Sequence, residues 1–156
     1  MITKLALTLD DAKQLMEAAE DEARRNDWEV VIAIVNDGGR IVAVHRMDGA
    51  RPGNDEIALA KANTSAMTCR PSGVWERWIE TNHRAYATFP FLAAQGGLPI
   101  IIDGHLVGAM GISGVKSFED EIIAMHAIIT VFPQAATARA GEENDGLIPR
   151  IAAENS

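Results

Sequence analysis

The amino-acid sequence predicts an α+β fold in which an antiparallel sheet of four to five strands, built from two hairpins, is flanked by helices. Apolar, β-branched segments occur as two pairs, residues 28–36 with 41–45 and residues 98–102 with 105–113, and a short glycine-containing turn joins each pair. Segments with the apolar spacing of helices lie before, between and after these pairs. Because a short turn joins antiparallel strands, this order excludes a parallel Rossmann sheet.

Length and charge indicate one acidic domain. A chain of 156 residues, 47% of them hydrophobic, can bury a core without disulfides or a structural zinc ion. Cys69 is the single cysteine, which excludes an intramolecular disulfide and a multi-cysteine metal site. The net charge of -8 argues against nucleic-acid and anionic-membrane partners. The sequence has neither an apolar stretch of membrane length nor a signal-peptide core, so we expect a cytoplasmic protein.

The first helix is predicted from Leu9 to about Arg25, with Thr8 as its N-cap. Asp11 occupies the position where a capping box usually has Glu or Gln. In the strand that follows, residues 30–35 are all apolar and do not alternate. We therefore expect both of its faces to be covered, one by helices and the other by a second layer or another subunit.

Two helices are expected between the hairpins. Asn54 is predicted to cap a helix over residues 55–68, which ends before Pro71 because the residue before a proline resists helical geometry. A shorter helix is expected over residues 72–83, followed by an irregular segment over residues 88–97.

The last helix is predicted to begin at its cap, Ser117, and to end near Pro133. Its apolar residues step by four and three, the spacing of an apolar helix stripe, which ordinarily faces a core. They are Phe118, Ile122, Met125, Ile129 and Phe132. We expect residues 1–133 to form the domain, and residues 134–156, which are small, polar and acidic, to form a C-terminal tail or an oligomer arm.

The chain contains no strong catalytic signature. The glycines between Gly108 and Gly114 resemble a nucleotide-binding loop in composition, but their spacing is wrong, and close packing of a helix on the sheet is the favoured interpretation. Ser113 and Gly114 lead to the helix start at Ser117, where free amides can hold a carboxylate or a propionate.

Each of the four histidines is a candidate general base or haem-iron ligand, with an ordinary structural role as the alternative. His45 lies where a strand passes into a loop, a place where functional groups are often presented. His83 lies in an irregular segment and is the best placed to move. His105 is expected to be exposed, and His126 is expected to be packed in the core or in an interface.

Positive charge collects in one stretch of this acidic chain. Arg46 and Arg51 flank the loop after the first hairpin, and Lys61 is the lysine of an otherwise apolar helix stretch. A helix lysine is usually solvated, but one near an apolar surface can bind a carboxylate. The stretch therefore favours a small anionic ligand.

Several blocks together resemble the GlcG/HbpS family, which includes the C-terminal domain of PduO-type proteins. The resemblance extends over about residues 5–130. Its blocks are residues 42–50, 56–62, 96–100, 104–114 and 120–121.

The resemblance implies a compact α+β domain with a profilin-like layer, assembled into homo-oligomers. It also implies binding of haem or a related tetrapyrrole, as in several members. Other relatives resemble small cofactor-free enzymes of aromatic-compound catabolism that act on ring-cleavage products.

The resemblance further implies one pocket formed by the matching blocks. Its implied residues are Arg46, Asp48, Glu56, Lys61, Gly96, Gly97, Ser113, Gly114, Asp120 and Glu121. This chain departs from the family pattern by having His45 before the Arg-Met-Asp-Gly run. Residues 9–25 contain no histidine, so that helix offers no haem ligand, and residues 75–91 are richer in Trp and His than expected.

Two functions are compatible with these residues. In the first, His83 or His45 ligates haem iron, Trp75 and Trp78 pack against the macrocycle, and a cation, Lys61 or Arg46, pairs with the propionates.

In the second, the protein is a cofactor-free hydrolase, deaminase or isomerase of a small unsaturated carboxylate. Arg46 and Lys61 would hold the acid group, and His45, His83 or Glu121 would transfer the proton. A third possibility is a scaffold or interaction subunit whose pocket is vestigial.

Overall fold

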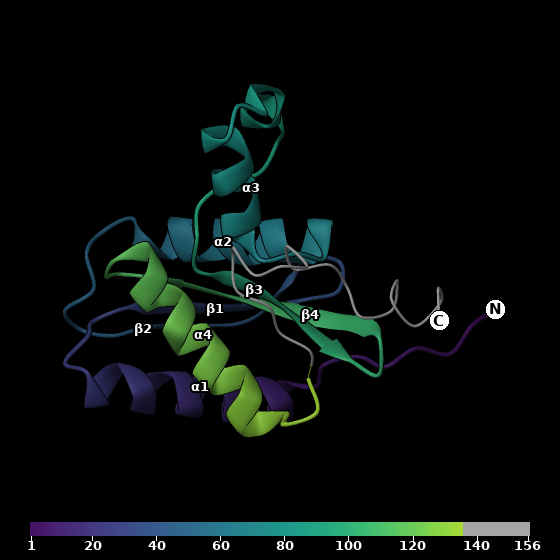
Figure 1. Cartoon of the computed structure of the whole chain (residues 1–156). Helices are drawn as coiled ribbons and strands as arrows, with labels where there is room; N and C mark the ends of the chain where they lie inside the picture. Colours follow the sequence, from purple (N-terminus) through teal and green to yellow (C-terminus); the bar gives the residue numbers. More distant parts are fainter. Residues whose placement is uncertain (136–156) are drawn as a thin grey trace.

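In the computed structural model, which describes residues 1–135, a four-stranded antiparallel sheet lies between helices on both of its faces (Figure 1). Its elements are α1 (Leu9–Arg25), β1 (Val31–Asn36), β2 (Ile41–Arg46), α2 (Asn54–Thr68), α3 (Ser72–Glu80), η1 (Arg84–Thr88), β3 (Gly97–Ile102), β4 (His105–Ser113) and α4 (Ser117–Val131). The strand order is β2-β1-β4-β3, so the two hairpins lie side by side with β1 against β4. The predicted α+β class and both hairpins are confirmed.

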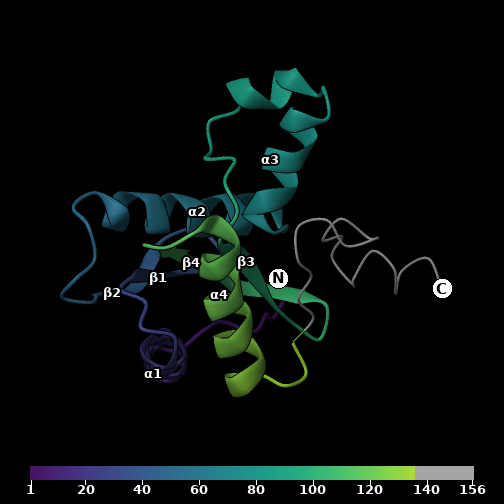
Figure 2. The same cartoon turned by 60° about the vertical axis from the view of Figure 1, so that its left-hand side comes forward.

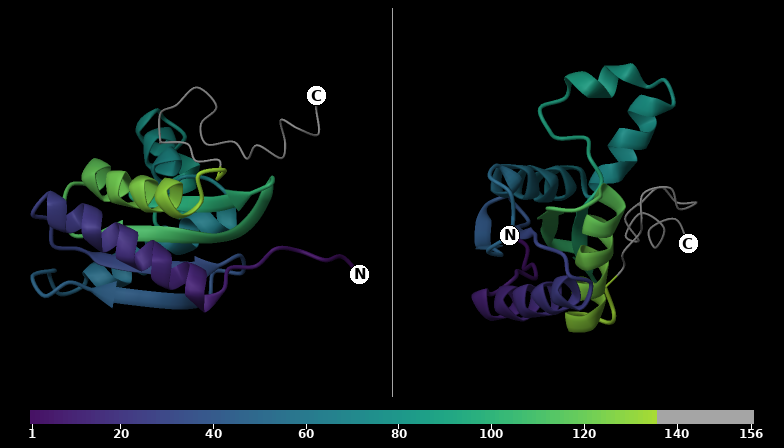
Figure 3. Two further views of the ribbon diagram at one scale, coloured as in Figure 1. Left: turned by 90° about the horizontal axis from the view of Figure 1, so that it is seen from below. Right: turned by 90° about the vertical axis from the view of Figure 1, so that its left-hand side faces the viewer.

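The two faces of the sheet carry separate cores. Ile32 and Ile34 of β1 pack with α1 and α4 on one face, while Val31, Ala33 and Val35 pack with α2 on the other. Figure 3 shows α1 and α4 side by side on their face of the sheet. Both faces of β1 are covered, as predicted, and α2 of the same chain supplies the second layer.

Of the three predicted helix caps, one is confirmed and two are wrong. Thr8 caps α1, since its Oγ accepts from the Asp11 amide at 3.1 Å and the Asp11 carboxylate accepts from the Thr8 amide at 2.8 Å. The predicted cap Asn54 is wrong, because Asn54 is already helical and follows Gly53 in the left-handed region. Ser117 is likewise the first residue of α4 rather than its cap, which is Lys116.

Only part of the stripe predicted for the last helix packs against the core, namely Met125 and Phe132, which are partly buried. Four other residues of α4 are fully buried against the sheet and α1: Ile123, Ala124, Ala127 and Ile128. Phe118 and Ile129, from the predicted stripe, are about half exposed at 51% and 46%. α4 is apolar on nearly every side, so its sequence offers two stripes and the spacing alone does not select the inner one.

The glycines of β4 allow close packing of helix on sheet, as predicted. A Cβ atom on Gly111 would lie 2.0 Å from the carbonyl oxygen of Ala58 in α2. No side chain fits at that distance, so α2 lies directly on the backbone of β4.

Residues 72–95 form an arm that extends away from the layers (Figures 1 and 2). The expected helix over residues 72–83 ends at Glu80, and the 3-10 helix η1 follows. Trp75 is the centre of the arm, with ring centroids 5.0 Å from Trp78, 5.1 Å from Tyr86 and 5.0 Å from Phe91. This aromatic cluster is a small core of its own.

The predicted tail lies, after Ala135, outside the described residues. None of the helices found in residues 1–135 is long and apolar enough to cross a membrane.

Candidate functional site

A buried ion pair lies where several of the matching blocks meet. The ammonium of Lys61, from α2, lies 2.8 Å from the carboxylate of Asp120, from α4, and their side chains are only 4% and 2% exposed. Lys61 Nζ also donates to the carbonyl oxygen of Ile112 in β4 at 3.0 Å. Asp120 in turn accepts a hydrogen bond from the Val115 amide at 3.2 Å. The pair therefore ties α2, β4 and the start of α4 together.

This ion pair involves Lys61, which the sequence analysis considered as a binding group for an anion. Burial raises the pKa of Asp120, and the charge and hydrogen bond of Lys61 oppose that increase. Because the ammonium is directed at Asp120 and buried, Lys61 is the counter-ion of the protein's own carboxylate. In this structure it does not present its charge to a cleft.

The glycine block lies against this pair. A Cβ atom on Gly96, which has a φ of 125°, would lie 2.8 Å from Lys61 Nζ. The next amide, of Gly97, donates to the Ser72 hydroxyl at 2.8 Å and so fixes the base of the arm. These glycines let the chain pass over a buried charge, which is a structural role.

Glu121, the residue after Asp120, is bonded to a residue that lines a cleft at the base of the arm. Its side chain is buried and accepts from the Gln95 side-chain amide at 3.1 Å. The Gln95 backbone amide donates to the carboxylate of Glu76 at 2.9 Å. The cleft has a volume of about 320 Å³. Its lining is Gly73, Glu76, Arg77, Glu80, Gln95, Ser117 and Phe118.

The amides before α4 are occupied by the chain's own acids. Glu119 accepts from the Lys116 amide at 3.0 Å, as Asp120 does from Val115. Ser113 contacts Asn54 with an oxygen to oxygen distance of 3.4 Å, and Gly114 lies against the backbone of residues 29–30. The position expected to hold a carboxylate is thus filled internally.

Arg46 and Asp48 line a different cleft, with a volume of about 290 Å³. The lining is Glu20, Arg24, Glu29, Arg46, Met47 and Asp48. Arg46 closes the loop by donating to the carbonyl oxygen of Ala50 at 2.7 Å. Glu56 is exposed on the first turn of α2. The residues of the matching blocks are therefore spread over more than one place instead of surrounding one pocket.

His45 stands next to this second cleft and is held by a carboxylate. Its Nδ1 lies 2.6 Å from Glu20 Oε1 of α1, and the imidazole is 52% exposed. Burial raises the pKa of Glu20, but the hydrogen bonds from His45 and Arg24 outweigh it, so the net pKa lies below the ordinary value. A carboxylate only accepts, so Nδ1 carries the shared proton and a neutral ring presents the Nε2 lone pair.

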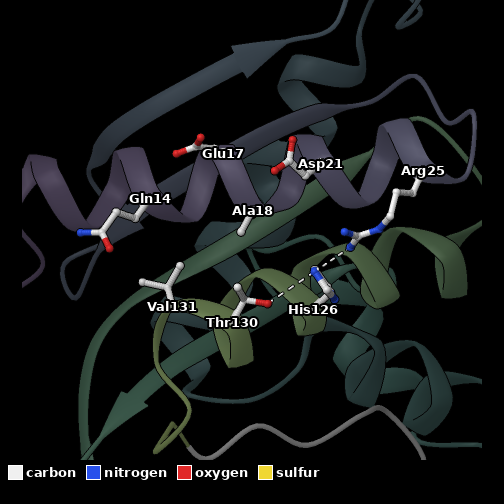
Figure 4. Close-up of a pocket in the computed structure, with 8 residues that line it drawn as sticks. All are labelled: Gln14, Glu17, Ala18, Asp21, Arg25, His126, Thr130 and Val131. Carbon is white, nitrogen blue, oxygen red and sulfur yellow. Dashed lines mark hydrogen bonds between the residues drawn. The ribbon is translucent and has the colours of Figure 1, made fainter.

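The other histidines lie elsewhere. His126 lines a groove of about 350 Å³ between α1 and α4, where its Nε2 is 2.9 Å from the Arg25 guanidinium (Figure 4). His83 belongs to the arm and stacks on Tyr86, with the two ring centroids 6.0 Å apart. His105 is exposed at the turn of the second hairpin, as expected.

Trp75 and Trp78 pack on each other and on the rings of the arm. They lie on the arm together with His83. His45, in contrast, contacts α1, on the face of the sheet opposite to α2. Sequence reasoning missed Glu20 and Gln95, whose partners are 25 and 26 residues away. No local spacing signals contacts of that separation.

Residues 7–129 match the protein family described as haem degrading protein HbpS-like. The chain is 36% identical to protein GlcG of Escherichia coli K12 over 114 residues, which covers 72% of this chain and 85% of that one. The solved structure of a PduOC:heme complex superposes with a TM-score of 0.76 at 26% identity, covering 86% of this chain and 100% of that one. The structure of HbpS also gives a TM-score of 0.76 at 26% identity, covering 85% and 94%.

Proposed function

Because the chain belongs to the HbpS-like family, we propose that it binds haem, with the His45 imidazole as the iron ligand. The support from relatives is the PduOC structure, which is named as a heme complex and is similar over nearly the whole described fold. The remainder of the proposal rests on the chain's own donor groups.

The observation that carries the proposal is the hydrogen bond between Glu20 and His45. Histidines that bind metals almost always donate their second ring N–H to a carboxylate or carbonyl, which orients the ring and raises its basicity. Glu20 supplies such a carboxylate at 2.6 Å, and the half-exposed imidazole leaves Nε2 for the iron. His126 fits less well, since a guanidinium occupies its Nε2.

The surroundings of His45 fit a haem that is bound at the surface. Arg24 and Arg46 both line the adjacent cleft, but Arg24 is paired with Glu20 and Asp21. Arg46 is therefore the cation that we assign to a propionate carboxylate, and Met47 adds an apolar contact. A cleft of about 290 Å³ is too small to enclose a whole macrocycle, so one edge stays in solvent. When bound, haem supplies the iron and its redox chemistry, and these residues supply orientation and charge.

Other elements of the first hypothesis are not retained in this proposal. Trp75, Trp78 and His83 lie together on the arm, and Lys61 is paired with Asp120. The cofactor-free enzyme relied on Lys61 to hold a substrate carboxylate, and that ammonium is already bound. Cytoplasmic location and homo-oligomeric assembly stay predictions.

Haemin titration followed by the Soret band tests the proposal. The unmodified protein is expected to give a shifted, sharpened Soret band that saturates. His45→Ala is expected to lose the low-spin spectrum, whereas the matched controls His83→Ala and His105→Ala keep it, because those imidazoles lie elsewhere.

A flat titration of the unmodified protein would refute haem binding altogether. If haemin binds but His83→Ala loses the spectrum while His45→Ala keeps it, the protein is a haem binder with a different ligand.

A further inference from the structure

The carboxylate of Glu20 has a partner on each of its two oxygens. Oε1 lies 2.6 Å from His45 Nδ1, and Oε2 accepts from the guanidinium of Arg24 at 2.7 Å. Arg24 lies four residues after Glu20 on α1, so the two side chains are neighbours on one side of that helix. Arg24, Glu20 and His45 therefore form a chain of hydrogen bonds from α1 to β2, beside the cleft of about 290 Å³.

The two partners of Glu20 compete for the same negative charge. A carboxylate that accepts the Nδ1–H of an imidazole raises the basicity of the other ring nitrogen, because it draws that proton toward itself. A guanidinium is always charged and forms a strong, charge-assisted bond with the second oxygen. Arg24 therefore weakens the pull of Glu20 on the His45 proton.

We propose that Arg24 acts through Glu20 to set how strongly His45 donates to haem iron, and thereby raises the reduction potential of the bound haem. The proposal rests on the proposed function, since it requires His45 as the iron ligand. A ligand that donates less electron density favours ferrous over ferric iron, because the ferric ion carries one more positive charge. Hydrogen bonds to an axial ligand are one of the ways in which a protein adjusts this balance. Arg24 is a positioning residue in this role, because it contacts Glu20 and Glu20 contacts the imidazole.

The exposure of the side chains makes this role testable. The side chain of Glu20 is 19% exposed, whereas that of Arg24 is 59% exposed, so Arg24 can be replaced without emptying the core. Arg24 also lies 3.3 Å from Asp21, which is 57% exposed. The shorter and less exposed bond is the one to Glu20, so the loss of Arg24 is felt mainly there.

Redox titration of the haemin complex measures the effect. Arg24→Gln is expected to favour ferric over ferrous haem by between about threefold and tenfold, and tenfold corresponds to a fall of about 59 mV in the midpoint potential. Arg24→Lys keeps the charge and is expected to restore most of the potential.

Arg25→Gln is the matched control. It removes the same charge from the next residue of α1, whose side chain is 57% exposed but is bonded to Glu22. This variant is expected to leave the potential nearly unchanged. An Arg25→Gln variant whose potential falls as far as that of Arg24→Gln would overturn the proposal, because net charge would then explain the shift.

A Glu20→Gln background shows whether Arg24 acts through Glu20. There Arg24→Gln is expected to shift the potential much less, because the amide carries no charge for the guanidinium to compensate. An equal shift in both backgrounds would overturn the proposal, since Arg24 would then act on the iron by its charge alone.

Two more results count against this role of Arg24. They are an unchanged or raised potential in Arg24→Gln, and loss of haemin binding by that variant. All of these outcomes are distinct from failure of the proposed function. A flat haemin titration of the unmodified protein, or a low-spin spectrum that His45→Ala keeps, refutes His45 as the ligand before any potential is measured.

Discussion

At the scale of single residues, the Lys61 and Asp120 pair makes the largest electrostatic demand on the fold. Two charges removed from water are tolerated only while each satisfies the other. Lys61→Met or Asp120→Leu is therefore expected to lower the free energy of unfolding by about 3–5 kcal/mol. The double variant Lys61→Met/Asp120→Leu is expected to recover most of that loss, because no uncompensated charge remains.

Urea unfolding of the four proteins measures the coupling directly. Single variants as stable as the unmodified protein would show that the pair is not a structural requirement. They would also return Lys61 to consideration as a ligand-binding group.

The hydrogen bond between Glu20 and His45 makes the free energy of unfolding depend on pH. The pKa of Glu20 in the folded protein lies below the ordinary value of 4.5, so its stabilising bond with His45 is complete above that value. The contribution is lost as the pH falls through the lower, folded value. Glu20→Gln is expected to cost about 0.5–1 kcal/mol at about pH 7 and much less at about pH 3.

Unfolding of both proteins by urea at the two pH values checks the sign. Equal differences at both would show that the carboxylate of Glu20 does not bind His45 as a charged group. In haemin titrations Glu20→Gln is expected to weaken the complex less than His45→Ala does, because it removes orientation and leaves the ligand.

Sequence information indicates where a candidate residue lies better than it indicates which residue contacts it. His45 was singled out because it ends a strand beside a loop, and the structure places it at an open edge beside a cleft. Glu20 lies in the preceding helix, and only the packing of α1 on the sheet brings it to the imidazole. Lys61 and Asp120 are 59 residues apart and meet for the same reason.

At the scale of elements, α1 and α4 show when a periodic pattern suffices. α1 has one apolar face and a charged one, so its cap, length and buried side follow from its sequence. α4 is apolar nearly all round, and its inner stripe was misassigned. The side of α4 that is buried carries the small residues Ala124 and Ala127, which pack in the core with α1 and the sheet.

The arm depends on its central tryptophan. Trp75 is buried, contacts four other rings and donates to the Thr68 hydroxyl at 3.1 Å. Trp75→Ala is expected to cost about 3–5 kcal/mol. In this variant, amide hydrogen exchange is expected to rise more in residues 72–95 than in the sheet, because the arm has its own small core.

Phe89→Ala is the matched control, since Phe89 belongs to the same cluster but is 40% exposed and is expected to cost much less. Exchange that rises equally in the arm and the sheet would show that the arm is continuous with the main core.

At the scale of the whole molecule, the sheet separates two kinds of residue that the family pattern groups together. Lys61, Gly96 and Asp120 meet between α2 and the start of α4 and hold the layers together. His45 lies on β2 against α1, with Arg46 and Met47 at the neighbouring cleft. A family motif can therefore describe the frame of a fold, while a residue that departs from it, here His45, marks the candidate ligand.

The assignment of His45 as the iron ligand can be checked in a crystal structure of the protein with haemin bound. We expect iron bonded to His45 Nε2, with Glu20 still on Nδ1 and a propionate near Arg46. Iron bonded to another side chain, or haem seated on the arm against Trp78 with His45 free, would contradict it.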